Sequence, residues 1–374
     1  MKVAYILKYF PKNSETFIHE EIYQLIKKGV KVRIFSLTKG KTEKNHKKVE
    51  YILQRVKLKT YSWSPLSIIN NILELKKETF LLPELTIRID VKSLLKDIND
   101  FNPDYIHTHF MFERAELTSY IAKKVNKPFS ITCHAKDIYH PNIRRIKKVG
   151  ERANKVITIS EFNRRLLIKQ GVRLDKIEVI HCGIDLQDFT LSKEKNRKKK
   201  IILSIGRFVE KKGFIYLLKA SKILKDKGED IDLRIIGYGP LERSLKKFVR
   251  DNKLNVHFIG KTVDEETQKE IDHCDLFVLA CVKSKDGDMD GIPVVLMEAM
   301  AKGKTVISTN LSGIPELIDD QKNGYLINPN NEFELAEAIL KFNKLYPVTI
   351  RSKIEEEFNS SKEVEKLLKV WKNA

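Results

Sequence analysis

The feature that most constrains this chain is a regular alternation between short β-branched stretches and amphipathic helical stretches. Such alternation predicts parallel sheets with helices on both faces. In the first half the predicted strands are residues 2–7, 31–36, 105–107, 128–132, 155–159 and 177–181, and the predicted helices are residues 15–28, 91–100, 114–125 and 161–170. The pattern in residues 40–90 is less regular, and we expect short strands and a helix there.

The alternation restarts in the second half. The predicted strands are residues 201–205, 232–236, 256–258, 276–280, 305–308 and 325–327, and the predicted helices are residues 214–226, 241–252, 265–273, 293–302, 315–318, 332–342 and 360–372. Each half therefore fits a Rossmann-like, doubly wound parallel sheet of the α/β class. Ligands bind such sheets beyond the carboxyl ends of the strands, so we expect a site in a central cleft between two facing domains.

A charged stretch that is poor in apolar residues, SKEKNRKKK at 192–200, separates the two halves. A chain of 374 residues is longer than one hydrophobic core normally supports. We predict an N-terminal domain over residues 1–191, a linker over 192–200, a C-terminal domain over 201–355 and a helical tail over 356–374.

The formal net charge of +20 favours anionic partners. A nucleic-acid partner is not expected, because the basic residues are not interleaved with aromatic ones and no reading module is present. The basic stretch at residues 144–148 instead has the pattern of an amphipathic helix that suits an anionic membrane surface. A lysine-rich surface with no partner is the alternative.

Cysteine usage and hydropathy indicate a cytoplasmic protein. Four cysteines without a CxxC pair suit free thiols in a reducing compartment. Lys8 interrupts the first apolar run and no cleavage site follows, so this run predicts a buried strand and not a signal peptide. No apolar run approaches the roughly 20 residues that cross a bilayer. We therefore expect a cytoplasmic protein that contacts the inner face of the cell membrane at most peripherally.

Two cations follow the first strand of the second half. Arg207 and Lys212 lie in the loop GRFVEKKG, between glycines. Cations in this position suit the charge of a diphosphate leaving group, which is the task that a metal ion performs elsewhere. The alternative is a solvated basic turn.

Small residues follow two further strands of this half. Gly237 and Gly239 allow close backbone approach to a ligand, although many α/β loops have this pattern without one. Ser312 and Gly313 precede a helix that begins with proline, where exposed amides suit an anion. An ordinary helix cap is the alternative for this second pair.

Two carboxylates flank the stretch from Asp290 to Glu298, which contains Gly291 and Ile292. Eight residues of helix rise about 12 Å. That length suits a nucleotide sugar, with one carboxylate accepting hydroxyl groups at each end. Glu298 lies in an apolar segment, where an unpaired carboxylate is costly; a structural glutamate bonded to nearby backbone is the alternative.

In the first half, polar side chains follow the predicted strands. His109 follows strand 105–107, and His134 follows strand 128–132. A single histidine at a strand end is usually structural, but two such loops at the ligand edge of one sheet favour a site. The loop after the first strand contains Ser14, Glu15 and Thr16, which suit a helix cap and contacts with an acceptor.

The acidic cluster at residues 286–291 raises the alternative of a metal site. It resembles the start of an EF-hand loop, but Met297 occupies the twelfth position, and Glu298 comes one residue too late. Its Asp-x-Asp spacing also suits a divalent ion. Because Arg207 and Lys212 already supply positive charge, we expect no metal and no other cofactor.

These motifs together resemble the family 4 retaining glycosyltransferases, which have the GT-B fold. GRFVEKKG, IIGYGPLERSL, DGIPVVLMEAMAKG and SGIPELIDDQKNGYLI occur in the order and at the spacing of that family. HTHF, TCHAKDIY, ITISEFNRRLL and IHCGID extend the resemblance through the first half. SETFI and GDMDGIPVVLMEAMA are most similar to the branch that builds bacterial surface polysaccharides.

The resemblance implies a role for each matching position. Arg207 and Lys212 would contact the diphosphate, Glu298 the ribose hydroxyls, and Asp290 the donor sugar. His134 would meet that sugar from the opposite domain. The resemblance also implies retention of anomeric configuration by front-face attack, with the leaving phosphate helping to accept the acceptor's proton.

The sequence departs from the family pattern at three places. Asp290 stands where a glutamate is usual, and Ser312 with Gly313 stands where two glycines are usual. The loop after the first strand has no glycine-rich turn. In relatives the last helix returns to the first domain, and we expect the same of residues 360–372.

The expected function is transfer of a sugar from a nucleotide diphosphate sugar to a glycan acceptor, lipid-linked, in bacterial surface polysaccharide synthesis. A nucleotide-sugar 2-epimerase shares this fold and is one alternative; it would turn over the donor without an acceptor. A non-catalytic nucleotide-sugar binding protein is the other alternative, suggested by Asp290.

Overall fold

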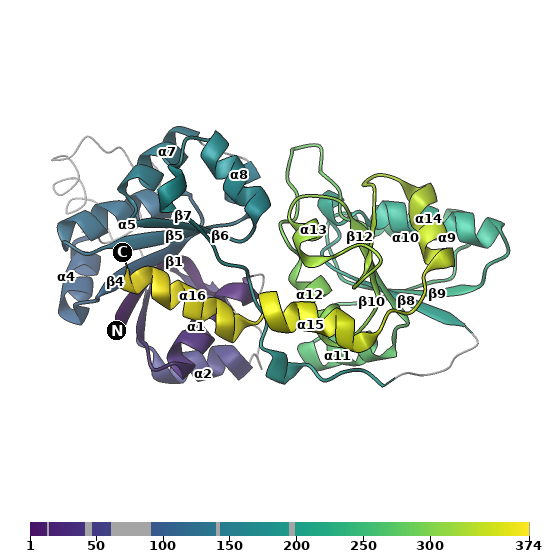
Figure 1. The fold of residues 1–374 in the computed structure, drawn as a ribbon, viewed down its shortest axis with the longest axis horizontal. Helices are drawn as coiled ribbons and strands as arrows, with labels where there is room; N and C mark the ends of the chain where they lie inside the picture. The colour runs from purple at the N-terminus through teal and green to yellow at the C-terminus, as the bar shows by residue number, and fades with distance from the viewer. Residues whose placement is uncertain (13–14, 42–46, 61–90, 140–142, 194–198, 374) are drawn as a thin grey trace. The chain divides into compact units, whose positions relative to one another are not determined.

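The computed structural model describes residues 1–12, 15–41, 47–60, 91–139, 143–193 and 199–373. The chain forms two compact units (Figure 1). One unit comprises Met1–His181 with Ser360–Ala374, and the other comprises Cys182–Asn359. Each is built on its own parallel sheet.

The first unit contains a seven-stranded sheet in the order β3-β2-β1-β4-β5-β6-β7. The strands are β1 (Lys2–Lys12), β2 (Lys31–Lys41), β3 (Leu58–Thr60), β4 (Tyr105–His109), β5 (Phe129–Cys133), β6 (Lys155–Thr158) and β7 (Ile177–Val179). All their pairings are parallel. The strand order reverses between β1 and β4, and this reversal creates a switch point where loops on either side diverge.

Helices cover both faces of this sheet (Figure 1). One face carries α4 (Val91–Phe101), α5 (Glu113–Lys124), α6 (Ala135–Tyr139), α7 (Ile143–Arg152) and α8 (Glu161–Lys169). The other carries α1 (Thr16–Lys27), α2 (Lys47–Arg55) and α16 (Ser360–Lys372).

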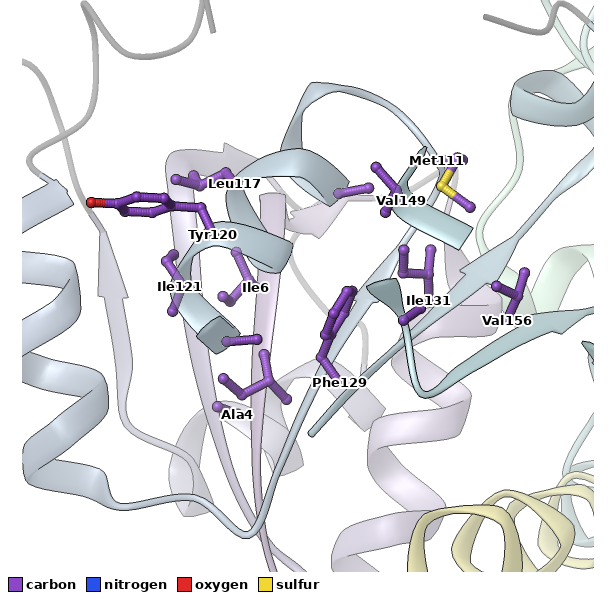
Figure 2. Close-up of a cluster of buried hydrophobic side chains, with 14 of the residues drawn as sticks. Ala4, Ile6, Met111, Leu117, Tyr120, Ile121, Phe129, Ile131, Val149 and Val156 are labelled. Carbon is purple, nitrogen blue, oxygen red and sulfur yellow. The ribbon is translucent and has the colours of Figure 1, made fainter. Parts of the chain in front are cut away.

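The core of this unit follows from the period of two along each strand. On β1, Ala4 and Ile6 face the α5 side, whereas Val3, Tyr5 and Leu7 face the α1 side. Figure 2 shows the α5 side, where the apolar side chains of β1, β5 and β6 meet those of α5 and α7. Since both faces are covered, the strand is apolar almost throughout.

The final helix, α16, belongs to the first unit. The Trp371 indole Nε1 donates a hydrogen bond of 2.9 Å to the Ser130 hydroxyl in β5. The Ser360 hydroxyl donates to Glu20 of α1 over 2.7 Å. Val364, Leu367 and Trp371 are buried in the same core as α1. The chain thus returns to its first unit to complete that unit's core.

The second unit contains a six-stranded parallel sheet in the order β10-β9-β8-β11-β12-β13. The strands are β8 (Lys200–Ile205), β9 (Ile231–Ile236), β10 (Val256–Gly260), β11 (Leu276–Leu279), β12 (Val306–Thr309) and β13 (Tyr325–Ile327). Here the order reverses between β8 and β11, which is the second switch point.

Helices also cover both faces of the second sheet. One face carries α9 (Phe214–Asp226), α10 (Glu242–Asp251) and α14 (Glu332–Lys341). The other carries α11 (Asp264–His273), α12 (Val294–Ala301), α13 (Ile314–Leu317) and α15 (Pro347–Glu357). The α/β fold of two doubly wound sheets is therefore confirmed.

The boundary between the units differs from the prediction. The chain passes from one unit to the other after His181, ten residues before the predicted domain end at 191. Ile184 and Phe189 are buried in the core of the second unit, and Ser192 donates to Asp272 of that unit over 2.7 Å. The charged stretch at 192–200 therefore begins inside the second unit, because apolar residues before it are already packed there.

Candidate active site

Two basic residues and two acidic residues meet at the switch point of the second sheet. Lys212 Nζ lies 2.7 Å from Asp290 Oδ2, and Lys211 Nζ lies 3.4 Å from Asp290 Oδ1. Lys211 also contacts Asp288 at 3.0 Å. These four residues form the lysine–aspartate cluster. The lysines follow β8 and the aspartates follow β11, so the cluster bridges the two strands where the sheet order reverses.

The ion pair between Lys212 and Asp290 is mostly shielded from solvent, with side-chain exposures of 15% and 13%. Burial opposes charge on both groups, but their attraction and hydrogen bond outweigh it. The pKa of Lys212 is therefore raised and the pKa of Asp290 is lowered, so both stay charged at neutral pH. Cys281 adds a hydrogen bond of 3.6 Å from its thiol to Asp290.

Glycines bring the loops at this switch point close together. Gly237 has a φ of +151°, and a Cβ built on it would lie 1.9 Å from the carbonyl oxygen of Gly206. Gly213 has a φ of +66°, and its Cβ would lie 1.7 Å from the carbonyl oxygen of Ala280. Only glycine fits such approaches. The loops after β8, β9 and β11 are consequently packed against one another by their backbones.

Arg207 is the exposed cation of this site. It follows β8 directly, and its positive charge disfavours protonation of Lys212, which places the two cations near each other. The aliphatic part of Lys212 lies over Gly206, since a Cβ there would be 3.3 Å from the Lys212 Cδ. An anion at this loop would therefore meet both cations and a short stretch of backbone.

The acidic loop before α12 is organised by its own hydrogen bonds. The Ser284 hydroxyl lies 2.5 Å from an Asp286 carboxylate oxygen and 2.7 Å from the Asp288 carbonyl oxygen, and its one proton is shared between these two acceptors. The Asp288 amide donates to Asp286 over 3.1 Å. Asp286 therefore stabilises the turn, whereas Asp288 and Asp290 contact lysine side chains.

The predicted helical spacing between Asp290 and Glu298 is wrong. Helix α12 begins at Val294, four residues after Asp290, because Gly291, Ile292 and Pro293 form an irregular turn. The 12 Å estimate therefore does not apply to the whole interval. Glu298 itself lies on α12 and is half-buried, while most of the other side chains of the helix are buried in the core.

Ser312 and Gly313 lie between β12 and α13. The Ser312 hydroxyl donates to the Gly291 carbonyl over 3.2 Å, so this loop contacts the loop that holds Asp290. The Ile314 and Glu316 amides donate to Leu311 and Gly313 carbonyls within the turn. These two amides are already hydrogen-bonded within the turn. The amides predicted to bind an anion are therefore reduced to those that precede the helix.

The first unit contains a second polar cluster, beside the switch point of its own sheet. We call it the histidine cluster. It consists of Tyr5 of β1, Glu21 of α1, His107 and His109 of β4, and His134 after β5. In the sheet, Tyr5 lies opposite His107. Glu21 Oε1 lies 2.6 Å from the Tyr5 hydroxyl and 3.1 Å from His109 Nε2. His109 Nδ1 lies 3.1 Å from His134 Nε2.

Burial decides the charge of the histidine cluster. It lowers the pKa of His107 and of His109 to about 3, and it lowers the pKa of His134 well below the usual value. Burial also raises the pKa of Glu21. The three imidazoles are therefore neutral at physiological pH.

The loop that carries His134 is fixed by Asp137. One carboxylate oxygen of Asp137 accepts from the His134 amide over 2.9 Å, and the other accepts from the Met111 amide over 2.6 Å. The rings of Phe17 and Phe110 lie 4.4 Å and 4.6 Å from the His134 ring. The orientation of His134 is thus constrained by both backbone and packing.

The predicted acceptor residues before α1 have different positions. Ser14 lies outside the described residues. Glu15 precedes α1 without capping it by its side chain, and it forms an ion pair with Lys12 at 2.6 Å instead. Thr16 is exposed at the start of α1. Of the polar groups predicted to cap this helix, Glu15 occupies the N-cap position without a side-chain cap, because Lys12 binds its carboxylate.

Five members of these clusters were not predicted as site residues: Tyr5, Glu21, His107, Lys211 and Asp288. In the sequence, Lys211 fits a solvated turn, Tyr5 fits a buried strand, and Glu21 fits the polar side of an amphipathic helix. None of these patterns indicates a site. The ligand atoms of Glu21, His107 and His109 lie within 4.8 Å of one another, a spacing that also suits a metal ion. All three residues are hydrogen-bonded within the protein.

The comparisons with known proteins cover both units. The family model "Glycosyltransferase Family 4" matches residues 14–188, and the model "Glycosyl transferases group 1" matches residues 187–359. The amylovoran biosynthesis glycosyltransferase AmsK of Erwinia amylovora is 30% identical over 393 aligned positions, which cover 96% of each chain. The chain belongs to the family 4 glycosyltransferases.

Further relatives of this glycosyltransferase agree. An Escherichia coli K12 protein assigned to colanic acid biosynthesis, WcaL, is 29% identical over 96% of each chain. Among solved structures, Anabaena HepE in complex with UDP-glucose has a TM-score of 0.75 at 15% identity, covering all of both chains. TarM has a TM-score of 0.75 at 14% identity, over 99% of each chain. These structures confirm the GT-B fold, and the relatives do not favour the epimerase or the non-catalytic alternative.

Proposed function

We propose that this glycosyltransferase transfers a sugar from a nucleotide diphosphate sugar to a glycan acceptor during assembly of a bacterial surface polysaccharide. The names of AmsK and WcaL, which refer to amylovoran and colanic acid, support the polysaccharide. The UDP and UDP-glucose bound by HepE support the donor class. A lipid-linked oligosaccharide is the acceptor we propose.

The observation that carries this proposal is the group of cations at the second switch point. Arg207 is exposed, and Lys212 is held beside it by Asp290. When the bond between sugar and diphosphate breaks, negative charge grows on the departing phosphate. Fixed cations at that position stabilise the developing charge more than they stabilise the ground state.

The ion pair between Lys212 and Asp290 suggests how the donor is received. A bound diphosphate would compete with Asp290 for the Lys212 ammonium group. Asp290 would then be released to accept hydroxyl groups of the donor sugar, while Lys212 contacts the phosphate. Glu298 would accept the ribose hydroxyls, and the small residues of the site would line the donor: Gly237, Gly239, Gly291, Ile292, Ser312 and Gly313.

We propose that the reaction retains anomeric configuration and needs no metal. The acceptor oxygen forms its bond to the anomeric carbon on the face that the diphosphate leaves, and the acceptor's proton passes to the leaving phosphate. Arg207 and Lys212 supply the positive charge that a metal ion supplies in other transferases. His134 would contact the transferred sugar, and Ser14, Glu15 and Thr16 would serve the acceptor side. The side chain of His109 is buried and bonded to Glu21 and His134, so it would act through His134 and not by contact with the acceptor.

We place this activity at the inner face of the cell membrane. Helix α7 exposes Arg144, Lys147 and Lys148 beside Ile143, which is 55% exposed. Exposed lysines with an apolar neighbour suit an anionic lipid surface. Among the described residues, no helix has the length and apolarity to cross a bilayer. The proposed association is therefore peripheral.

The test is a screen of nucleotide sugars for thermal stabilisation in the presence of EDTA, followed by a transfer assay on the donor found. Binding to the folded state raises the unfolding midpoint by mass action. We expect the nucleotide sugar to raise the unfolding midpoint without divalent metal. The product should have the same anomeric configuration as the donor sugar, and Glu298→Ala should lose transfer. A shift that requires added metal, or an inverted product, would contradict the proposal.

A further inference from the structure

Glu21, His109 and His134 form a continuous hydrogen-bonded line in the first unit. Glu21 Oε1 is 3.1 Å from His109 Nε2, and His109 Nδ1 is 3.1 Å from His134 Nε2. His109 and His134 are buried, with exposures of 1% and 6%. The line therefore runs from a partly exposed carboxylate, through one buried imidazole, to a second imidazole.

The positions of the protons along this line follow from the chemistry of Glu21. Its Oε1 accepts a hydrogen bond from the Tyr5 hydroxyl over 2.6 Å. A carboxylate oxygen only accepts, and the carbonyl oxygen of a protonated carboxyl group also accepts. We take Oε1 to carry no proton, with Glu21 either ionised or protonated on Oε2, and His109 then donates from Nε2. Because a neutral imidazole has a single N–H, His109 Nδ1 is an acceptor.

The same reasoning extends to His134. Its Nε2 faces the unprotonated Nδ1 of His109, so Nε2 must carry the proton of this ring. Both rings are neutral, since burial lowers their pKa values. Nδ1 of His134 is then unprotonated. Among the residues that the structure describes, this nitrogen has no hydrogen-bond partner in the protein.

We infer that Glu21 and His109 are positioning residues that fix His134 in its Nε2–H tautomer, so that Nδ1 accepts a hydrogen bond from a hydroxyl group of the bound sugar. The inference rests on the proposed function, which assigns His134 to the substrate. It adds a chemical requirement: the sugar group at this position must donate a hydrogen bond. A deoxy or fluoro sugar at that position would bind less well.

The surroundings support a fixed hydrogen-bond acceptor rather than a metal ion. Arg114 Nε donates to the His109 carbonyl over 2.7 Å, which fixes the backbone of that residue. His107 uses Nδ1 with Ser130 at 2.8 Å and Nε2 with Thr132 at 3.1 Å. The ring nitrogens that a metal would need are thus already engaged by protein groups.

The direct experiment measures the tautomers in the ligand-free protein. Protein labelled with ¹⁵N-histidine gives long-range ¹H–¹⁵N spectra in which each tautomer has its own pattern, and His109→Gln and His134→Gln variants assign the rings. We expect the Nε2–H form for both His109 and His134. An Nδ1–H form of His134 in the parent protein would overturn the inference, and this measurement requires no substrate and no stable Glu21 variant.

The kinetic experiment compares two neighbouring glutamates on α1. Glu21→Gln gives the amide a donor that competes for His109 Nε2, so we expect mixed tautomers at His134. We expect kcat to fall about tenfold, the kinetic equivalent of one hydrogen bond, with a smaller change in KM. Glu20→Gln is the matched control, because Glu20 bonds Gln24 and Ser360 outside the line; its tautomers and kcat should match the parent.

Further variants distinguish positioning from simple structural support. His134→Asn retains an acceptor near the Nδ1 position and should keep more activity than His134→Gln. Parent tautomers together with parent kcat in Glu21→Gln would contradict the inference, as would stoichiometric zinc that is lost in that variant. If no sugar transfer were found but the tautomers were as expected, the proposed function would fail while the proton arrangement stood.

Discussion

The Lys212 ammonium group lies 2.7 Å from the Asp290 carboxylate, and this ion pair joins the loops that follow β8 and β11. The two residues have separate proposed ligands, the diphosphate for Lys212 and the donor sugar for Asp290. Because the two side chains contact each other in the ligand-free protein, a bound donor would have to break this ion pair. It would then form two contacts, diphosphate with Lys212 and sugar with Asp290. The pair therefore keeps a mostly buried cation compensated until the donor arrives.

This relationship predicts opposite effects of Asp290→Asn on binding and on turnover. Without the competing carboxylate, a nucleoside diphosphate should bind about fivefold more tightly, as expected when an ion pair of about 1 kcal/mol is lost. Sugar transfer should fall, because the amide no longer accepts sugar hydroxyls in the same way. Calorimetry with the nucleoside diphosphate and a transfer assay measure the two effects. Asp288→Asn is the control, since Asp288 contacts Lys211; weaker binding in Asp290→Asn would contradict the exchange.

The histidine cluster predicts a loss of stability in mild acid. Burial lowers the pKa of His107 and His109 from 6.5 to about 3. A lowered folded-state pKa gives stability that is complete above pH 6.5 and is lost as the pH falls from there toward 3. At pH 5 each histidine should cost about 2 kcal/mol. Glu21, whose pKa is raised by burial, has the opposite sign and reduces the net loss.

Urea unfolding of the parent and of His107→Gln at pH 7.5 and pH 5 measures this effect. The parent should lose unfolding free energy between the two pH values, and the variant should lose about 2 kcal/mol less. The difference between the two proteins isolates His107 from other titrating groups. Equal losses in parent and variant would show that His107 is not held neutral by burial.

The packing around Gly237 predicts that the second unit is destabilised when this residue gains a side chain. A Cβ at this position would lie 1.9 Å from the Gly206 carbonyl oxygen, so Gly237→Ala must move the loop after β8. Gly228→Ala is the matched control: Gly228 also has a positive φ, of +82°, but its Cβ would meet nothing within 4 Å. The control should cost about 1 kcal/mol, and Gly237→Ala about 1–3 kcal/mol more. Equal unfolding midpoints would contradict the packing described.

The burial of Trp371 predicts that the stability of the first unit depends on α16. The indole is 3% exposed, stacks on Tyr105 with ring centroids 5.5 Å apart, and donates to Ser130. Trp371→Ala should lower the unfolding free energy by about 3–5 kcal/mol. Trp371→Phe keeps most of the ring contact and should cost much less. Similar stability of Trp371→Ala and the parent would mean that α16 does not contribute to this core.

Regular elements were predicted well where the apolar period was clear. Helix α9 and strand β13 have the predicted bounds. In α9 the buried positions recur at the helical period. Strand β1 continues to Lys12, five residues beyond the prediction, since pairing with β2 sustains it past Lys8. Helix α15 was not predicted; Ile350 and Ile354 alone anchor it in the core.

The site residues were predicted where a loop follows a strand, and missed where sheet topology brings side chains together. Arg207, Lys212 and Asp290 stood out by charge at strand ends. Glu21 did not, because only the adjacency of β1 and β4 places α1 beside His109. In the described part of the chain between β1 and β4 there are two strands and three helices, so no local pattern reveals this adjacency.

The most direct measurement of the central claim is kcat/KM for sugar transfer in Arg207→Ala and Lys212→Ala, with Lys219→Ala as control. Lys219 is a half-exposed lysine of α9 that pairs with Glu332. If the cations at the β8 loop stabilise the departing diphosphate, each of the two site variants should lose about a hundredfold, while the control stays near the parent value. Parent-like turnover in Arg207→Ala and Lys212→Ala would contradict the account.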